Sequence, residues 1–303
     1  MAQRKIPVIL DTDIGTDIDD TWALIQLLNT PELDPRLILT AIGDTRYRAK
    51  LTAKLLETAG RTDIPIGVGI YQDGGHLNFQ EPWLDGFELS NYKGTIFDDG
   101  LQAMIRIIMD SDEPITLISI AAVTNIARAL EIEPGIAGKC RFVGMHGSLR
   151  FGYAGQPGAI PEANVRGNIP GLRKVFSAPW LEKIITPLDT CGVVVLSDER
   201  YQRVFKPELP IIKALMENNK MFSENVTWMK VDYAHERSTT LFDMVAVYLA
   251  LSQRELINFE NMRISVTDDR MTVLDPNGYE LQVAISWKDL DSFLDYLVER
   301  LLT

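Results

Sequence analysis

Cysteine and histidine are scarce in this chain of 303 residues, which has two cysteines and three histidines. The cysteines, Cys140 and Cys191, are far apart and belong to no metal-binding motif. Neither a disulfide framework nor a zinc site is therefore expected. Such sparse use of cysteine is typical of a reducing compartment, and we expect a cytoplasmic protein.

Long apolar runs and an excess of positive charge are also missing. No apolar run approaches the roughly 18 residues that a membrane span needs, and the run 6–10 is too short for the core of a signal peptide. The chain has 30 Lys and Arg against 42 Asp and Glu, a net charge of −12. This balance argues against a nucleic-acid partner, because few cations are left to neutralise phosphates. We expect a small neutral molecule or a cation as ligand, and no membrane partner.

The first two-thirds of the chain alternate short apolar runs with amphipathic stretches. Strands are expected at 6–11, 37–43, 64–69, 115–120, 142–145 and 193–196, and helices at 20–29, 47–59, 100–109, 123–130 and 171–176. Apolar strands separated by helices predict a mostly parallel sheet that is covered on both faces. Because no linker divides the chain, residues 1–303 are expected to form one α/β domain.

The C-terminal part has a different pattern. Two apolar stretches, 263–266 and 280–285, flank the turn sequence Asp275-Pro276-Asn277-Gly278. This arrangement predicts a small β-hairpin or a short antiparallel excursion, followed by a last helix from about Ser286.

Five carboxylates lie within ten residues directly after the first predicted strand, at Asp11, Asp13, Asp17, Asp19 and Asp20. In open α/β sheets, ligands bind outside the carboxyl ends of the strands. Some of these acids suit a helix N-terminus, and the pair Thr16 and Asp19 has the spacing of a capping box. Capping does not account for all five, because like charges in a tight loop repel one another. Packed carboxylate oxygens instead favour calcium or magnesium.

Two familiar acidic loops fit this segment incompletely. An EF-hand needs Gly at its sixth position and Glu at its twelfth, where this chain has Thr16 and Trp22. The haloacid dehalogenase-like pattern D-x-D-x-[TV] fits except at Gly15. That alternative predicts a magnesium-dependent phosphatase in which Asp11 is the phosphorylated nucleophile.

The segment from Asp11 to Ala23 reads D-T-D-I-G-T-D-I-D-D-T-W-A. It resembles D-x-D-P-G-x-D-D-x-x-A, the signature of the nucleoside hydrolases. The match departs at Ile14, where Pro is usual, and in two extra residues after Gly15. Further matches follow in the order of the family, at Gly43-Asp44, 117–127, Met145-His146-Gly147-Ser148, Glu162-Ala-Asn164, Pro187-Leu188-Asp189 and 241–247.

The resemblance implies the nucleoside hydrolase fold, which is Rossmann-like, and one Ca²⁺ at the bottom of a ribose pocket. The implied metal ligands are Asp13, Asp20 and Asp243 through their carboxylates and Ile120 through its backbone carbonyl. The implied sugar-binding residues are Asp19, Asp44, Glu162 and Asn164. Asp13 would also be the catalytic base that takes a proton from a calcium-bound water. Structural alternatives remain, because Thr240 and Asp243 have capping-box spacing and Glu162 lies in a polar, glycine-rich loop.

The residue that helps the base to leave is less well defined. Inosine–uridine-preferring members have a His immediately before the late Asp, where this chain has Phe242. Three other side chains are candidate donors, namely His235, Tyr233 and His146. The segment from Tyr71 to Gly100, with His76 and Trp83, matches the family poorly. It is expected to be a lid or a substrate-side loop that sets the base specificity.

The function predicted from these residues is calcium-dependent hydrolysis of the N-glycosidic bond of a ribonucleoside, which releases ribose and a free base. The missing histidine keeps a second reading open, in which the same scaffold binds or cleaves another pentose glycoside. By resemblance, a homodimer or homotetramer is expected.

Overall fold

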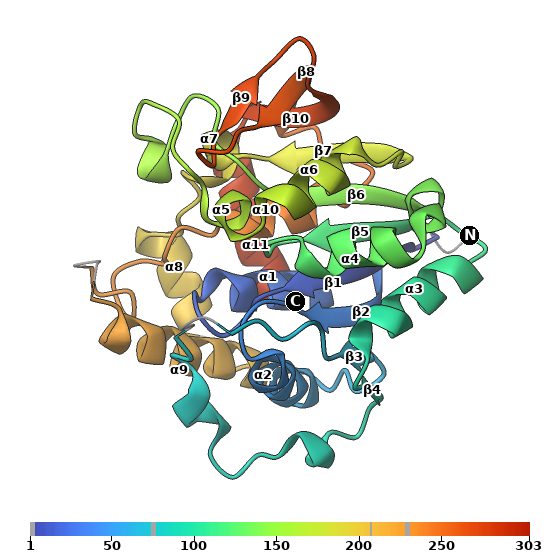
Figure 1. The fold of residues 1–303 in the computed structure, drawn as a ribbon. Coiled ribbons are helices and arrows are strands. Elements are labelled where there is room, and N and C mark those ends of the chain that lie inside the picture. The colour runs from blue at the N-terminus through green and yellow to red at the C-terminus, as the bar shows by residue number, and fades with distance from the viewer. Residues whose placement is uncertain (1–3, 74–76, 207, 228–230) are drawn as a thin grey trace.

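The computed structural model describes residues 4–73, 77–206, 208–227 and 231–303 (Figure 1). In these residues one sheet runs through the molecule in the strand order β4-β3-β2-β1-β5-β6-β7-β10-β8-β9. The strands are β1 (Ile6–Thr12), β2 (Leu33–Thr40), β3 (Ile66–Gly67), β4 (Ile96–Phe97), β5 (Ile115–Ser119), β6 (Cys140–Met145), β7 (Glu182–Thr186), β8 (Ile257–Val266), β9 (Thr272–Leu274) and β10 (Tyr279–Trp287). All pairs are parallel except those that β8 makes with β10 and β9.

Helices cover both faces of the sheet. They are α1 (Asp19–Leu28), α2 (Thr45–Thr58), α3 (Gly100–Asp110), α4 (Thr124–Ile132), α5 (Ala163–Gly167), α6 (Ile169–Ser177), α7 (Leu188–Cys191), α8 (Asp198–Phe205), α9 (Pro210–Asn225), α10 (Phe242–Leu249) and α11 (Leu290–Leu301). Val8 and Leu10 of β1 pack in one hydrophobic cluster with α1, α10 and α11, whereas Ile9 packs in another with α3, α4 and α6. Successive side chains of a strand point to opposite faces, and here both faces are apolar. The predicted mostly parallel α/β fold is confirmed.

The prediction for the C-terminal strands is only partly right. Residues 263–266 and 280–285 do belong to antiparallel neighbours, because Arg263 pairs with Glu280. The turn at 275–278 does not close a hairpin between its flanking strands, however. Ile264 of β8 pairs with Leu274 of β9 on one side and with Tyr279 of β10 on the other, so the turn carries the chain past the end of β8. The last helix, α11, begins at Leu290, where Asp289 caps it.

One predicted strand is wrong, and three real strands were missed, namely the short β4 and β9 and the longer β7. Residues 193–196 lie between α7 and α8 and belong to no strand of the sheet. Val194 and Leu196 are buried and accept backbone hydrogen bonds from Leu241 and Ser238, which explains their apolar pattern. The strand beside β6 is β7, whose sequence begins with Glu182 and Lys183 and so shows a weak hydrophobic signal. None of the helices in the described parts of the chain is long and apolar enough to cross a membrane.

Asn125 near the start of α4 ties the carboxyl ends of β1 and β2 together. Its Nδ2 donates to Asp11 Oδ1 at 2.7 Å and to the Thr40 carbonyl at 3.0 Å, and its Oδ1 accepts from the Ile70 backbone N–H at 2.9 Å. The side chain is fully buried. It therefore supports the edge of the sheet on which polar side chains gather.

We predict that Asn125→Ala lowers the free energy of unfolding by about 3 kcal/mol, because three buried polar groups lose their partner. Urea denaturation followed by circular dichroism measures this loss. Arg128→Gln on the same helix, whose ion pair with Glu131 is exposed, is the matched control and should unfold like the wild type. Equal midpoints for Asn125→Ala and the wild type would contradict the prediction.

Candidate functional site

A cavity of about 220 Å³ opens at the carboxyl ends of the central strands. It is lined by Asp13, Thr16, Asp17, Asp19, Asp20, Ile120, Met145, Tyr153, Glu162, Ala163, Asn164, Phe242 and Asp243. The strands β1, β5 and β6 end at this cavity, and α1 and α10 begin there. Segments far apart in the sequence thus place six carboxylates around one small space.

Three of these carboxylates form a compact, buried cluster. Oxygens of Asp19, Asp20 and Asp243 lie within 4.8 Å of one another, and each residue is only 4% exposed. Burial, and next the charges of neighbouring carboxylates, raise the pKa of Asp19 and Asp243 well above the usual range. After burial, the charge of Asp19 is the largest influence that raises the pKa of Asp243. Without a cation, the cluster must hold protons.

The geometry of the cluster suits a divalent cation. Calcium binds six to eight oxygens at 2.3–2.6 Å, so opposite ligands are about 4.8 Å apart. The predicted ligands Asp20, Asp243 and Ile120 line the same cavity, and so does Asp13. The compact cluster contains Asp19 rather than Asp13, although the Asp13 charge raises the pKa of Asp20. The acidic cluster is thus able to bind a metal.

Helix capping does not explain these acids. The residues at the N-caps of α1 and α10 are Ile18 and Leu241, and neither makes a side-chain capping bond. Both capping-box alternatives from the sequence are therefore wrong. Asp20 instead accepts a hydrogen bond from Thr12 Oγ1 at 2.5 Å, which holds one of its oxygens beside the end of β1.

The loop between β1 and α1 is held from behind by Arg48 of α2, which the sequence analysis missed. Its guanidinium is fully buried and donates to the carbonyls of Asp13 and Ile14 and to Thr16 Oγ1. Burial raises the pKa of Asp20 well above its usual value, and the positive charge of Arg48 partly offsets this. Only the position of Arg48 on a helix facing the loop reveals this contact, because no motif marks it.

Glu162 and Asn164 also line the cavity and are held firmly. Glu162 accepts hydrogen bonds from the backbone N–H groups of Gly147, Asn164 and Val165 at 2.6–3.1 Å. Burial nevertheless raises the pKa of Glu162 to about 7. Asn164 Nδ2 donates to the Met145 carbonyl at 3.0 Å. Glu162 thus caps α5 and also lines the cavity.

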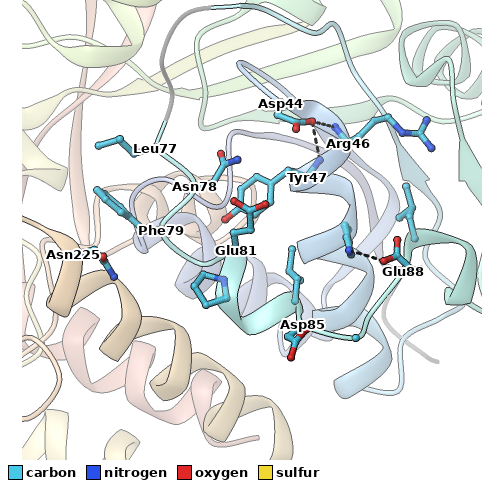
Figure 2. A pocket seen from close by; sticks show the side chains of 15 residues that line it. Asp44, Arg46, Tyr47, Leu77, Asn78, Phe79, Glu81, Asp85, Glu88 and Asn225 are labelled. Atoms are coloured by element: carbon cyan, nitrogen blue, oxygen red, sulfur yellow. Dashed lines mark hydrogen bonds and ion pairs between the residues drawn. The ribbon is translucent and has the colours of Figure 1, made fainter.

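Asp44 lies elsewhere. It caps α2 by accepting from the backbone N–H groups of Arg46 and Tyr47 at 3.1 and 3.0 Å. Figure 2 shows it facing a second cavity of about 1040 Å³, together with Tyr47 and Glu81. Of the four predicted sugar-binding residues, Asp44 is the one outside the lining of the acidic cavity.

The three candidate proton donors are also absent from that lining. His146 is fully buried, bonds to the Ala121 carbonyl through Nε2 and has its pKa lowered to about 4 by burial. His235 is exposed and bonds to Asp232 at 2.8 Å. Tyr233 is buried against Phe222, and its pKa is raised by this burial and, to a smaller extent, by the charge of Asp17.

Two aromatic side chains do line the cavity. Tyr153 and Phe242 pack edge to face with ring centroids 5.7 Å apart, and burial raises the Tyr153 pKa to about 12. Tyr153 belongs to the polar loop that also contains Glu162, but an isolated aromatic in such a loop carries no distinctive signal. His76 lies outside the described residues, and Trp83 of the same segment donates to Glu217 at 2.8 Å.

Asp11 is not suited to be a nucleophile. It is fully buried, hydrogen-bonds to Asn125 and is absent from the lining of the cavity. Burial raises its pKa to about 7. A phosphorylated aspartate must reach its substrate, so this position counts against the phosphatase alternative.

The raised pKa values predict the pH dependence of the metal-free protein. The folded pKa values of Asp17, Asp11 and Glu162 are about 6, 7 and 7, above the values near 4 of an unfolded chain. The folded state therefore binds more protons between about pH 4 and 7, and its stability falls as the pH rises through this window. Thermal melts in chelator at pH 5.5 and 8 measure the loss, and added calcium should reduce it. Equal or higher stability at pH 8 in chelator would contradict this.

Comparisons with known proteins agree on one family. The model of the inosine-uridine preferring nucleoside hydrolase family matches residues 8–293. The chain is 29% identical over 205 residues to the non-specific ribonucleoside hydrolase RihC of Klebsiella pneumoniae, with 64% of each chain covered. It is 26% identical over 239 residues to the pyrimidine-specific ribonucleoside hydrolase RihA of Escherichia coli O1:K1, with 74% of each covered. The first alignment thus spans less than two-thirds of that relative's length.

Solved structures show the same fold. A plant nucleoside hydrolase superposes with a TM-score of 0.79 at 21% sequence identity, with 98% of both chains covered. At this identity the likeness concerns the fold alone.

Proposed function

Because the chain belongs to the inosine-uridine preferring nucleoside hydrolase family, we propose that it hydrolyses the N-glycosidic bond of ribonucleosides with the help of calcium. The observation that carries the proposal is the buried cluster of Asp19, Asp20 and Asp243 in a cavity at the carboxyl ends of the strands. Such a cluster has the donor atoms that calcium prefers. The cavity also lies where open α/β sheets usually bind their ligands, outside the carboxyl ends of the strands.

In this proposal Asp13, Asp20 and Asp243 bind calcium with the Ile120 carbonyl, and Asp19 either joins them or binds the sugar. Calcium, when bound, would lower the pKa of a water held in the site. Asp13 is the general base that accepts the proton of the attacking water, as its position in the lining of the cavity allows. The attack on the anomeric carbon passes through a state with oxocarbenium character. The surrounding carboxylates stabilise that positive charge.

Glu162 and Asn164 would hold the ribose hydroxyls. The observed hydrogen bonds of Glu162 and Asn164 fix their orientation before substrate arrives, which lowers the entropic cost of binding. The base would lie against Tyr153 and Phe242, since the aromatic pair borders the same cavity. We further propose that the protein is a cytoplasmic homo-oligomer.

The direct test measures ribose release from a panel of purine, pyrimidine and nicotinamide ribosides, with calcium and with chelator. We expect turnover of at least one riboside, which chelator abolishes and Asp13→Asn lowers by at least 100-fold. Asp110→Asn, in the last residue of α3 and outside the lining of the cavity, is a control that should keep wild-type turnover. If the protein binds stoichiometric calcium but hydrolyses no nucleoside, the alternative of another pentose glycoside is favoured instead.

A second prediction concerns the aromatic pair. Tyr153→Ala removes the edge-to-face partner of Phe242 and one wall of the cavity, and aromatic contacts of this kind are worth about 1 kcal/mol. We expect KM for the best nucleoside to rise about fivefold, while Tyr153→Phe stays within twofold of the wild type. Steady-state kinetics measure both. A large loss of kcat in Tyr153→Phe would instead indicate that the hydroxyl donates a proton to the leaving base.

A further inference from the structure

Two consecutive residues of α2 hold four consecutive residues of the loop between β1 and α1. The carbonyls of Asp13 and Ile14 accept from Arg48 Nη1, the second at 2.7 Å. Thr16 Oγ1 accepts from Arg48 Nη2 at 3.1 Å. The remaining residue, Gly15, is bound by Tyr47, whose hydroxyl donates to the Gly15 carbonyl at 3.0 Å. Every residue from 13 to 16 is thus tied to α2.

Arg48 is unusual because its charge is buried without a carboxylate partner. Among the described residues, none of the ion pairs involves its guanidinium, and its side chain is 0% exposed. Nε donates to the Ile42 carbonyl at 2.6 Å, so all three nitrogens are used on oxygen acceptors. Burying a charge is costly unless it is compensated. The carbonyl and hydroxyl oxygens that accept from all three guanidinium nitrogens supply that compensation.

The contacts depend on the particular shape of each group. A guanidinium is a rigid, planar fork, whereas the ammonium of Lys is a point charge on a flexible stem. Only the fork reaches the Ile42 carbonyl, the loop carbonyls and Thr16 together. Gly15 has φ +113°, and a Cβ there would lie 2.6 Å from Tyr47 Cε1. The glycine therefore allows the tyrosine ring to close against the loop.

The second cavity borders this arrangement. Tyr47 lines that cavity (Figure 2), and its oxygen also accepts from the Gln80 backbone N–H at 3.2 Å. Gln80 Nε2 in turn donates to the Asp17 carbonyl at 3.4 Å. Gln80 thus extends the support of the loop from Thr16 to Asp17. Asp17 is the acid that belongs to the two-residue insertion and lines the cavity.

We propose that Arg48, assisted by Tyr47, is a positioning residue that fixes the backbone of residues 13–16 so that the Asp13 carboxylate points into the cavity before metal and substrate bind. This inference rests on the proposed function for its catalytic consequence. Arg48 touches backbone and a hydroxyl behind the loop, not the reacting atoms. Its loss therefore acts through Asp13, by letting the loop move.

The experiment uses the full chain, with calcium alone as the binding probe. Arg48→Lys keeps the charge but loses the fork, and Arg48→Gln loses both. We expect the calcium dissociation constant from calorimetry to rise at least tenfold in both variants, with faster amide exchange in residues 13–19 by mass spectrometry. The matched control is Arg46→Gln, which removes an exposed arginine of α2 paired with Asp98. It should stay within twofold of the wild type.

A change of calcium affinity in the opposite direction would also be informative. If Arg48 acted only as a counter-charge, removing it would strengthen calcium binding, so tighter binding by Arg48→Gln would overturn the proposal. Wild-type affinity and exchange in Arg48→Lys would overturn it as well. With a nucleoside that the wild type hydrolyses, at saturating calcium, kcat of Arg48→Lys should fall at least tenfold while KM changes less than threefold. A change confined to KM would contradict a role in aiming Asp13.

If the Arg48 variants do not fold, Tyr47→Phe decides, because it removes one hydroxyl and keeps the ring. Faster exchange in residues 13–19 and about threefold weaker calcium binding are expected, and no change in either would count against the proposal. If the wild type binds no calcium, the calcium dependence of the proposed function is wrong. The exchange comparison would still support or overturn the positioning role.

Discussion

The structure around the cavity is organised by the repulsion among carboxylates that are buried together. Asp19, Asp20 and Asp243 have little contact with water and lie within reach of one another's charge. Such a cluster persists only if protons, a cation or fixed positive charge offset it. The raised pKa values indicate protons in the metal-free state. Calcium would replace those protons, so the same buried charges that weaken the metal-free fold at neutral pH would favour the binding of a metal.

The loop between β1 and α1 meets this constraint because its carboxylates and some of its backbone carbonyls point in opposite directions. The carboxylates of residues 13–20 face the cavity, whereas the carbonyls of Asp13 and Ile14 turn back to Arg48. A guanidinium suits this position because it is always charged and offers several donors in a fixed plane. Below the loop, Asn125 fastens Asp11 to the end of β2. The acids are therefore held by neutral and cationic groups that never enter the cavity.

The sequence predicted the parts of this arrangement that have a local pattern. Apolar strands and amphipathic helices reveal the parallel sheet, and acids that follow β1 predict the position of the cavity. Contacts between distant segments were not predictable in the same way. Arg48 and Tyr153 have no motif, and Asp44 stands in the right order along the chain but serves as the cap of α2. The strand β7 was missed because its first two residues are charged, which weakens its hydrophobic pattern. Residues 193–196 were wrongly predicted as a strand because a buried extended segment has the composition of a strand.

Two of the departures from the family pattern fall on the same cavity. The extra residues after Gly15 bring Asp17 into the lining, and Phe242 occupies the place where a histidine is usual. The first adds a negative charge and the second removes a group able to carry a proton. In the proposed mechanism, both changes would shift the balance from proton donation towards electrostatic and aromatic stabilisation of the substrate. The leaving base would then depend more on its own basicity and on the packing of Tyr153 and Phe242, and catalysis would rest mainly on a correctly aimed Asp13.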